Sequence, residues 1–350
     1  MKIGILTHPL HTNYGGLLQA LALQESIEQK GHHVVIINRE YPKTKQYGLI
    51  ALKVAFRQFA NDLVFNYKIK TFVRNNYKLS KKLLSSDKLS QYLDQTRFDA
   101  IIVGSDQVWR PKYSPDIFNY YLDVTEGLNM KRISYAASFG VDEWEYTDEE
   151  TKRCSQLARQ FDAISVREQS GVQLCKQYLG VDAQWVLDPT MLHDRCFYES
   201  LVKKYGDKPS DGDLFCYVLD KNNTKTSIIN QIAEELHYKP FYCNVSNNKT
   251  INPSVTKWIR SFMDARMVLT DSFHGTVFSI IFNKPFWVIG NERRGLSRFE
   301  SLLKLFGLEE RLITDANNID YIKPIEWSSV NNKLLELRRE SLSFLFNSIE

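Results

Sequence analysis

Short apolar runs alternate with longer amphipathic stretches along the first half of the chain. The apolar runs predict buried strands before residue 190, at Lys2–Thr7, His33–Asn38, Phe98–Val103, Arg132–Ala137, Phe161–Val166 and Gln184–Leu187. Stretches with apolar residues three and four positions apart predict helices at Leu17–Gln29 and Ser170–Tyr178. Strands that alternate with helices are typical of a parallel sheet covered by helices, so this half is predicted to be Rossmann-like.

A cluster of turn residues at 208–213 precedes a second alternation of the same kind. It predicts strands at Leu214–Leu219, Pro240–Asn244, Met267–Thr270 and Pro285–Ile289, and helices at Thr226–Leu236, Ser254–Asp264 and Thr276–Phe282. A last helical pattern covers 329–349. We therefore expect an α/β protein with two Rossmann-like domains, at 1–189 and 190–328. By analogy with other two-domain folds, the C-terminal helix at 329–350 is expected to return to the first domain.

Residues 41–95 interrupt this alternation and are strongly basic. Apolar residues recur there every three or four positions, which predicts a helical insert in the first domain; they are Leu52, Phe56, Phe59, Leu63 and Tyr67. The segment from Lys43 to Lys88 contains eleven basic residues and two aspartates, so its net charge is +9. Two interpretations are open. The insert is either a solvated charged face, or a basic amphipathic surface that contacts an anionic membrane or a lipid pyrophosphate.

The net charge, the cysteines and the lengths of the apolar runs exclude several classes of protein. Because the whole chain carries +4, the part outside the insert carries −5, which argues against nucleic acid as a partner. Five scattered cysteines without a C-x-x-C spacing indicate free thiols in a reducing compartment, and no metal-ligand spacing occurs. The chain starts with a strand pattern and has no apolar run of the ~18 residues that a membrane span needs. We expect a cytoplasmic protein without a bound metal or cofactor.

The turn Asp271–Gly275 is the first candidate site. It joins the predicted strand Met267–Thr270 to a helix, and the carboxyl ends of parallel strands are where ligands of open α/β sheets bind. His274 lies in this turn, and imidazole readily exchanges a proton near neutral pH. The following strand leads to more charged residues, namely Glu292, Arg293, Arg294 and Arg298. A proton donor and several guanidinium groups suit a small substrate with several negative charges.

Polar residues also follow the strands of the first half. Asn13, Gly15 and Gly16 follow the first strand; the glycine pair permits either a tight turn or a close approach of the backbone to a ligand. Later strands end in further polar side chains, which are Asp106 and Gln107, then Arg167 and Glu168, then Asp188. Arg167 could pair with Glu168 or Asp188, or it could bind a ligand.

Several segments together resemble the polysaccharide pyruvyl transferase family, of the bacterial capsule and exopolysaccharide type. They are NYGGLLQALAL at 13–23, DAIIVGSDQVW at 99–109, YAASFG at 135–140, ISVREQSG followed by VLDPTML, and TDSFHGTVFSIIFNKPF followed by RRGLSRF. The resemblance covers nearly the whole chain outside roughly 41–95. It implies two Rossmann-like domains facing a cleft, as in glycosyltransferase-B-like proteins. One departure stands out, because Ser272-Phe273-His274 occupies the place where members often have Arg-Leu-His.

The resemblance implies that a pyruvyl group moves from phosphoenolpyruvate to two hydroxyls of a sugar, favouring a galactose-type acceptor on a lipid-linked saccharide. In that reaction His274 would act as the acid and Asp106 as a second catalytic group. The residues expected to bind phosphoenolpyruvate are Arg167, Arg294, Arg298, Gly275 and Ser272. Those expected to contact the acceptor are Asn13, Gly15, Gly16, Gln107 and Asp188.

Two other functions fit the same sequence. A nucleotide-sugar glycosyltransferase of this fold would need a carboxylate for the ribose, a role open to Glu292. A non-catalytic carbohydrate-binding relative would bind sugar without turnover, but the presence of His274 together with the arginines argues against it.

Overall fold

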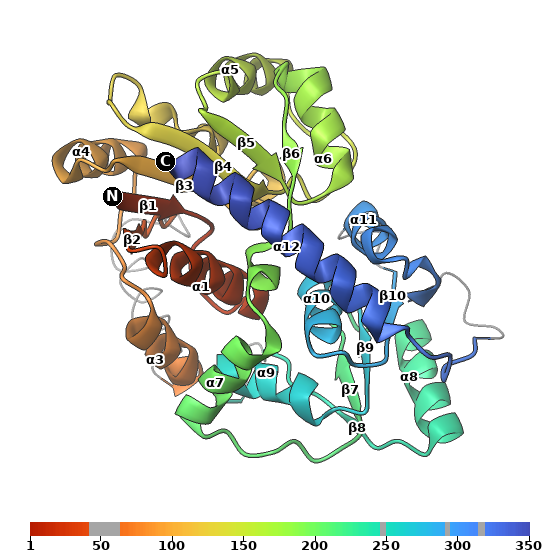
Figure 1. Ribbon diagram of the computed structural model, residues 1–350. Coiled ribbons are helices and arrows are strands. Elements are labelled where there is room, and N and C mark those ends of the chain that lie inside the picture. Colours follow the sequence, from red (N-terminus) through yellow and green to blue (C-terminus); the bar gives the residue numbers. More distant parts are fainter. Residues whose placement is uncertain (42–63, 246–249, 291–294, 314–318) are drawn as a thin grey trace, which may run out of the picture. The chain divides into compact units, whose positions relative to one another are not determined.

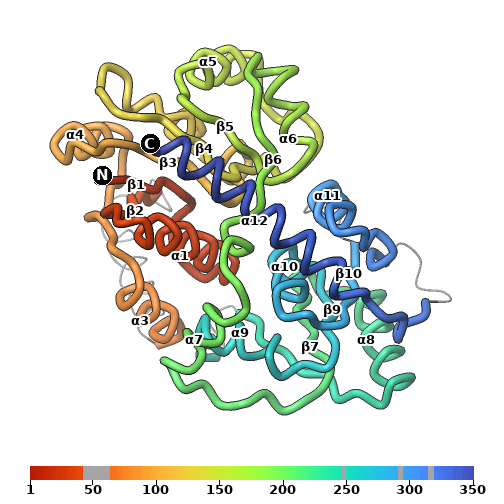
Figure 2. Tube along the Cα trace, in the orientation of Figure 1, coloured from red at the N-terminus to blue at the C-terminus, as the bar shows by residue number. Residues whose placement is uncertain are grey.

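The computed structural model describes residues 1–41, 64–245, 250–290, 295–313 and 319–350 (Figure 1). These residues divide into two compact units. Unit 1 is formed by Met1–Leu63, Val73–Leu192 and Leu337–Glu350, and unit 2 by Val64–Phe72 and His193–Glu336. The chain ends in unit 1 (Figure 2). The carboxyl-terminal residue Glu350 is close enough to His32 for its charge to act on the imidazole, and His32 lies beside the amino terminus.

Unit 1 is built on a parallel sheet of the strands β2-β1-β3-β4-β5-β6, in that order. Its strands are β1 (Lys2–Leu6), β2 (His33–Ile36), β3 (Ala100–Val103), β4 (Lys131–Ala137), β5 (Ala163–Val166) and β6 (Gln184–Trp185). Ile3 pairs with Val34 on one side and with Ala100 on the other, so β1 lies between β2 and β3. The extended segment after Tyr77 pairs with the end of β2 through Leu79 and with the chain beyond β2 through Leu83.

Helices cover both faces of this sheet. They are α1 (Tyr14–Glu28), α4 (Ser86–Thr96), α5 (Asp148–Ala158), α6 (Gln169–Leu174) and the last turns of α12 (Trp327–Ile349). One core joins alternate strand residues to α4, α5 and α6. On the other face α1 and α12 are neighbours, since Lys30 Nζ lies 4.9 Å from the centre of the Phe346 ring (Figure 1). Ser341 of α12 accepts a hydrogen bond from the backbone of Leu187, and Leu345 and Ile349 are fully buried.

Short helical turns connect these elements. They are η1 (Pro111–Tyr113), η2 (Ile117–Tyr121), η3 (Asp123–Thr125), η4 (Cys175–Leu179, a π-helix) and η5 (Pro189–Leu192). The sequence pattern did not predict α5. Its start is nevertheless encoded locally, because Thr147 and Glu150 form a reciprocal capping box.

Unit 2 has a parallel sheet in the order β11-β10-β9-β7-β8. Its strands are β7 (Leu214–Tyr217), β8 (Pro240–Phe241), β9 (Met267–Thr270), β10 (Phe286–Ile289) and β11 (Leu312–Ile313). Its helices are α7 (Arg195–Tyr205), α8 (Asn223–Leu236), α9 (Val255–Asp264), α10 (Phe273–Ile281) and α11 (Ser297–Phe306), with the turn η7 (Glu309–Arg311). Helix α8 packs on one face through Ile228, Ile229 and Ile232. Aromatic rings fill the other face, where Phe278 meets Tyr198 and Trp258 at 4.8 Å.

The predicted strands of both halves are present, and so are the helices predicted between them. Helix α3 (Tyr67–Asn76) and α4 lie within the predicted helical insert. Helix α3 crosses the division between the units after Phe72. Four residues of the predicted stripe, Leu52, Phe56, Phe59 and Leu63, lie outside the described residues, and the fifth, Tyr67, begins α3 and is exposed.

Candidate functional site

The two sheets share one strand order. In each sheet, the first strand of the sequence lies between the second and the third. The second strand is added on one side of the first strand, and the later strands are added on the other side. The direction of the connections therefore changes at the gap between the first and the third strand. Ligands of open parallel sheets bind beyond the carboxyl ends of the strands at such a gap. In unit 1 the gap separates β1 from β3, and in unit 2 it separates β7 from β9. His8 and Asp106 follow the first pair of strands, and the turn containing His274 follows β9.

Arg167, at the carboxyl end of β5, is the centre of a buried ion-pair cluster in unit 1. Its Nη1 donates a hydrogen bond to Asp188 Oδ2 at 2.8 Å. Its other nitrogens lie 3.8 Å from Asp106 Oδ1 and 4.0 Å from Glu168 Oε2. Burial opposes the charge of Arg167, but the carboxylates of Asp188, Asp106 and Glu168 together raise its pKa. Arg167 is therefore a fixed cation whose charge is shared among three carboxylates.

Asn13 and Gly16 bring the start of α1 against Asp106. Asn13 caps the helix by accepting the Gly16 N–H at 3.1 Å, while its Nδ2 donates to Asp106 Oδ2 at 3.2 Å. A Cβ on Gly16 would lie 3.0 Å from Asn13 Nδ2 and 3.2 Å from Asp106 Oδ2. Gly15 and Gly16 belong to the first turn of α1, so the tight turn, one of the two interpretations of this pair, is absent. The glycine at position 16 instead lets Asn13 and Asp106 meet.

Gln107 and Asp188 lie in the same region but are already engaged. Gln107 Oε1 accepts from Arg110 Nη1 at 3.3 Å, and it fills the space that a Cβ on Gly140 would need. The Asp188 side chain has no exposed surface and accepts hydrogen bonds from Arg167, from the Ser105 hydroxyl, and from the backbone and hydroxyl of Thr190. The structure thus gives Asp188 the contacts of a residue that positions Arg167.

In unit 2, Asp271 joins the two strands on either side of the gap. Its carboxylate accepts hydrogen bonds from the backbone of Leu219 and of Asp220, which follow β7, and from Lys225 Nζ at 2.6 Å. Ser272 then caps α10 by accepting the Gly275 N–H. A Cβ on Gly275 would come within 2.1 Å of Thr270 Oγ1, so only glycine allows this turn to pack on the end of β9.

His274 and Arg298 both contact Phe273. The imidazole packs edge-on against the Phe273 ring with the centroids 5.4 Å apart, and Arg298 Cζ lies 5.8 Å from the centre of the same ring. Both side chains are largely buried. Unit 2 therefore brings together the predicted acid and one predicted cation. Glu292, Arg293 and Arg294 lie outside the described residues.

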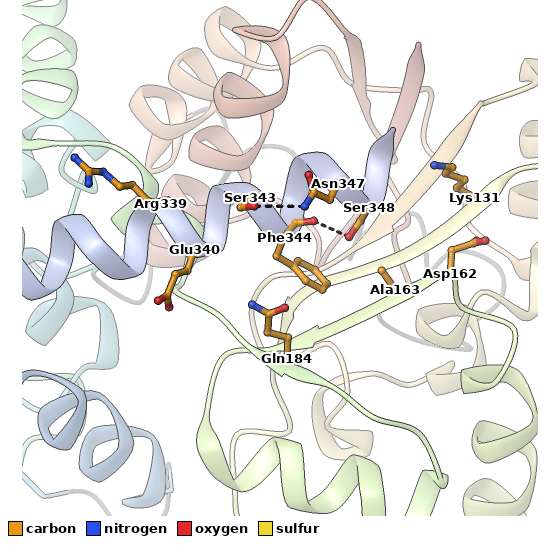
Figure 3. A pocket seen from close by; sticks show the side chains of 10 residues that line it. All are labelled: Lys131, Asp162, Ala163, Gln184, Arg339, Glu340, Ser343, Phe344, Asn347 and Ser348. Atoms are coloured by element: carbon orange, nitrogen blue, oxygen red, sulfur yellow. Dashed lines mark hydrogen bonds between the residues drawn. The ribbon is translucent and has the colours of Figure 1, made fainter.

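A cavity of about 770 Å³ in unit 1 lies away from these strand ends (Figure 3). It is lined by Lys131, Asp162 and Gln184, at the amino ends of β4, β5 and β6, and by side chains of α12 that include Phe344. A ligand there would be at the edge of the sheet opposite the carboxyl ends. The cavity is therefore distinct from the candidate site.

The sequence profile of the polysaccharide pyruvyl transferase family matches residues 13–293, which include Asn13, Asp106, Arg167 and His274. The chain belongs to the polysaccharide pyruvyl transferase family. Membership makes it a transferase, as the sequence predicted. Among curated proteins, none matches this member of the family.

Solved structures share the fold of this family member at low sequence identity. UGT71G1 of Medicago truncatula, complexed with UDP-glucose, is 10% identical with a TM-score of 0.53, and the match covers 99% of this chain and 98% of that one. The UDP-GlcNAc 2-epimerase of Methanocaldococcus jannaschii is 12% identical with a TM-score of 0.52, covering 96% and 91%. MnaA of S. aureus with UDP is 14% identical with a TM-score of 0.50, covering 96% and 87%. The predicted fold class, two Rossmann-like α/β domains of the glycosyltransferase-B type, is confirmed.

Two features of the site escaped the sequence analysis. Lys225, which neutralises Asp271, carried no motif. His8 was not singled out, although it follows β1 closely at the gap between β1 and β3. Its position after a strand, the same signal that identified His274, could have singled it out.

Metal and membrane features can be judged for the described ranges alone. There, no group of histidine, cysteine, aspartate and glutamate side chains is arranged to hold a metal ion. Within the same ranges, none of the helices combines the length and the apolar character that crossing a bilayer requires.

Proposed function

We propose that the protein transfers the pyruvyl group of phosphoenolpyruvate to a sugar of a surface-polysaccharide precursor and forms a pyruvate ketal. The observation that carries this proposal is the family match over a chain whose His274 lies at the carboxyl end of β9, in contact with the same ring as Arg298. A galactose-type sugar on a lipid-linked acceptor is the favoured substrate.

The chemistry needs an acid, cations and a proton acceptor. His274 would give a proton to the methylene carbon of phosphoenolpyruvate, which makes the adjacent carbon electrophilic. A sugar hydroxyl adds to that carbon and loses its proton. Phosphate then leaves with the electron pair of its C–O bond. The second hydroxyl adds to the same carbon and closes the ketal, and its proton passes to the departing phosphate. The products are the ketal and inorganic phosphate.

The donor contacts are assigned to unit 2. Arg298 and Arg294 would bind the carboxylate and phosphate groups, and Ser272 and the first N–H groups of α10 at Gly275 would add hydrogen bonds. Arg167 was predicted to take part as well. Three carboxylates already compensate its charge, and this reduces its attraction for a free anion.

The acceptor contacts are assigned to the carboxyl ends of β1 and β3 in unit 1. Asn13 is exposed and Gln107 is partly exposed, so both can present amide groups to sugar hydroxyls. Gly15 and Gly16 keep the start of α1 free of side chains. An anionic cluster around Arg167 suits a neutral, hydroxyl-rich ligand, since hydroxyls donate to carboxylates.

We further propose that the enzyme works at the cytoplasmic face of the membrane, where a lipid-linked acceptor would be found. The support comes from the segment Lys78–Leu84 of unit 1. Leu79 and Leu84 are 38% and 44% exposed, and Lys81 and Lys82 lie between them at the surface. Exposed leucines next to lysines suit peripheral contact with anionic lipid.

The direct test measures phosphate released from phosphoenolpyruvate with galactose-, mannose- and glucose-terminated acceptors, together with mass detection of the ketal. The His274→Ala variant serves as the control for phosphate from other sources. A parallel series with UDP-sugars detects the glycosyltransferase alternative by release of UDP. Saturable sugar binding without phosphate or UDP release would instead identify a carbohydrate-binding protein.

A further inference from the structure

His8 occupies a defined place at the gap between β1 and β3. It follows Thr7, whose hydroxyl donates to the Ser105 carbonyl at 3.1 Å, and this contact ties the end of β1 to the end of β3. The imidazole Nε2 lies 3.1 Å from Ser114 Oγ, and the ring packs edge-on against Tyr120 at 5.5 Å. The ring is thus held by contacts from the loop after β3 and from η2.

The hydrogen bonds at Ser114 determine which ring nitrogen carries the proton. Ser114 has a single hydroxyl proton, and it donates that proton to the Val108 carbonyl at 2.8 Å. Ser114 Oγ can therefore only accept from His8, so Nε2 is the protonated nitrogen. Nδ1 then keeps its lone pair. Within the part of the chain that the structure describes, no group is hydrogen-bonded to Nδ1.

Burial favours the neutral form of His8. Burial lowers the pKa of His8 most; the Asp106 carboxylate raises it and the Arg167 guanidinium lowers it further, and the net shift is downward. His8 is nevertheless partly exposed, so a ligand can reach it. A neutral imidazole with an open lone pair is a proton acceptor throughout the neutral pH range.

Asp106 is less suited to the same task. Its Oδ1 accepts from the Gln107 N–H at 2.9 Å, its Oδ2 accepts from Asn13 Nδ2, and the Arg167 guanidinium lies 3.8 Å away. These contacts hold Asn13 at the start of α1 and stabilise the carboxylate. Asp106 therefore positions its neighbours, whereas His8 has a ring nitrogen that can accept a proton.

We propose that His8 is the general base that takes the proton of the acceptor hydroxyl through Nδ1. This inference rests on the proposed function. The O–H bond of the sugar breaks, its electron pair forms the new bond to the pyruvyl carbon, and the proton moves to His8.

The first test compares His8→Gln with His11→Gln, a histidine in the same loop that has no assigned role. Glutamine at position 8 keeps an N–H donor for Ser114 but has no base. Thermal unfolding checks that both variants fold. His8→Gln should lose about 10²–10⁴ in turnover, with little change in the Michaelis constant for phosphoenolpyruvate, while His11→Gln should resemble the wild type.

The pH profile and the tautomer provide two further readouts. Wild-type turnover should fall on the acid side as His8 is protonated, at a pH below the ordinary histidine value of about 6.5, and His8→Gln should lack this fall. Long-range ¹H–¹⁵N spectra of the wild type, assigned with the variant, should show the proton on Nε2.

The outcomes separate the two proposals. A proton on Nδ1, or more than half of wild-type turnover in a folded His8→Gln variant, would overturn the base assignment alone. A wild-type protein that releases no phosphate with any acceptor would overturn the proposed function and, with it, the role of His8.

Discussion

Lys225 Nζ lies 2.6 Å from Asp271 Oδ2, and both side chains are almost completely buried beside the turn that carries His274. The pair connects the first turn of α8 to the end of β9, and the same carboxylate holds the backbone after β7. One aspartate thus fixes the two strand ends between which unit 2 should bind its ligand.

Replacing Lys225 with Met should lower the free energy of unfolding by about 3–5 kcal/mol, because it leaves the buried Asp271 carboxylate without its cation. Lys239→Met is a matched control. Lys239 also pairs with an aspartate at 2.6 Å, but its side chain is 60% exposed and that of Asp211 is 93% exposed. Chemical denaturation should show no measurable change for this control. Equal losses of unfolding free energy in both variants would mean that burial does not determine how much such an ion pair contributes to stability.

His274→Ala should reduce turnover by about 10²–10⁴, the usual contribution of a positioned general acid. Phosphate release under saturating phosphoenolpyruvate measures the loss, and near-ultraviolet circular dichroism checks that the aromatic face of unit 2 is intact. A folded variant with more than half of the wild-type turnover would remove His274 from the mechanism.

Arg298→Lys and Arg294→Lys should raise the Michaelis constant for phosphoenolpyruvate, since an ammonium group cannot reproduce the two-pronged contact of a guanidinium. Arg167→Lys should mainly destabilise unit 1, because the hydrogen bond to Asp188 and the approach to Asp106 depend on the shape of the guanidinium. Initial-rate kinetics and thermal unfolding distinguish the two effects. Unchanged Michaelis constants in all three variants would place the anion site elsewhere.

Lys81→Gln combined with Lys82→Gln should weaken sedimentation with anionic vesicles at low salt, because each lysine near the surface gains about 1 kcal/mol from anionic lipid. Leu79→Ser with Leu84→Ser should weaken it as well. Lys203→Gln with Lys204→Gln, a pair of exposed lysines on α7, provides the control. Raising the salt should release the wild type, since charge screening shortens from about 10 Å at 0.1 M to about 3 Å at 1 M. Wild-type protein that stays in the supernatant at low salt would leave the segment as a solvated surface.

Only Cys196 should react quickly with a thiol reagent at pH 8. It is the exposed cysteine among five free ones. Burial raises the pKa of Cys216 and of Cys243 to about 12, and burial also raises the pKa of Cys154 and of Cys175. The reactive thiolate is therefore scarce at the four buried positions until the pH approaches those values or the chain unfolds. Cys196→Ser should abolish the fast phase of the reaction. A cysteine that still reacts quickly in that variant would contradict the burial of the other four cysteines.

The alternation of apolar and amphipathic stretches was enough to predict the turn containing His274 and the strands of both sheets except β11. These features depend on residues that are close together in the sequence. The contacts of Arg167 with Asp106 and of Lys225 with Asp271 join residues far apart in the chain, so no local pattern contains them. The importance of His8 follows from the order of the strands, which places β1 beside β3, and alternation alone does not fix that order.

The last turns of α12 have a consequence for how the chain folds during synthesis. Leu345 and Ile349 cover part of unit 1, and Ser341 binds the backbone after β6, yet these residues are made after all of unit 2. The strands of unit 1 leave the ribosome first, and at that stage the apolar surface under the helix has no cover. Chaperones can bind that surface until the helix arrives. The half of the molecule that is synthesised first is therefore completed last.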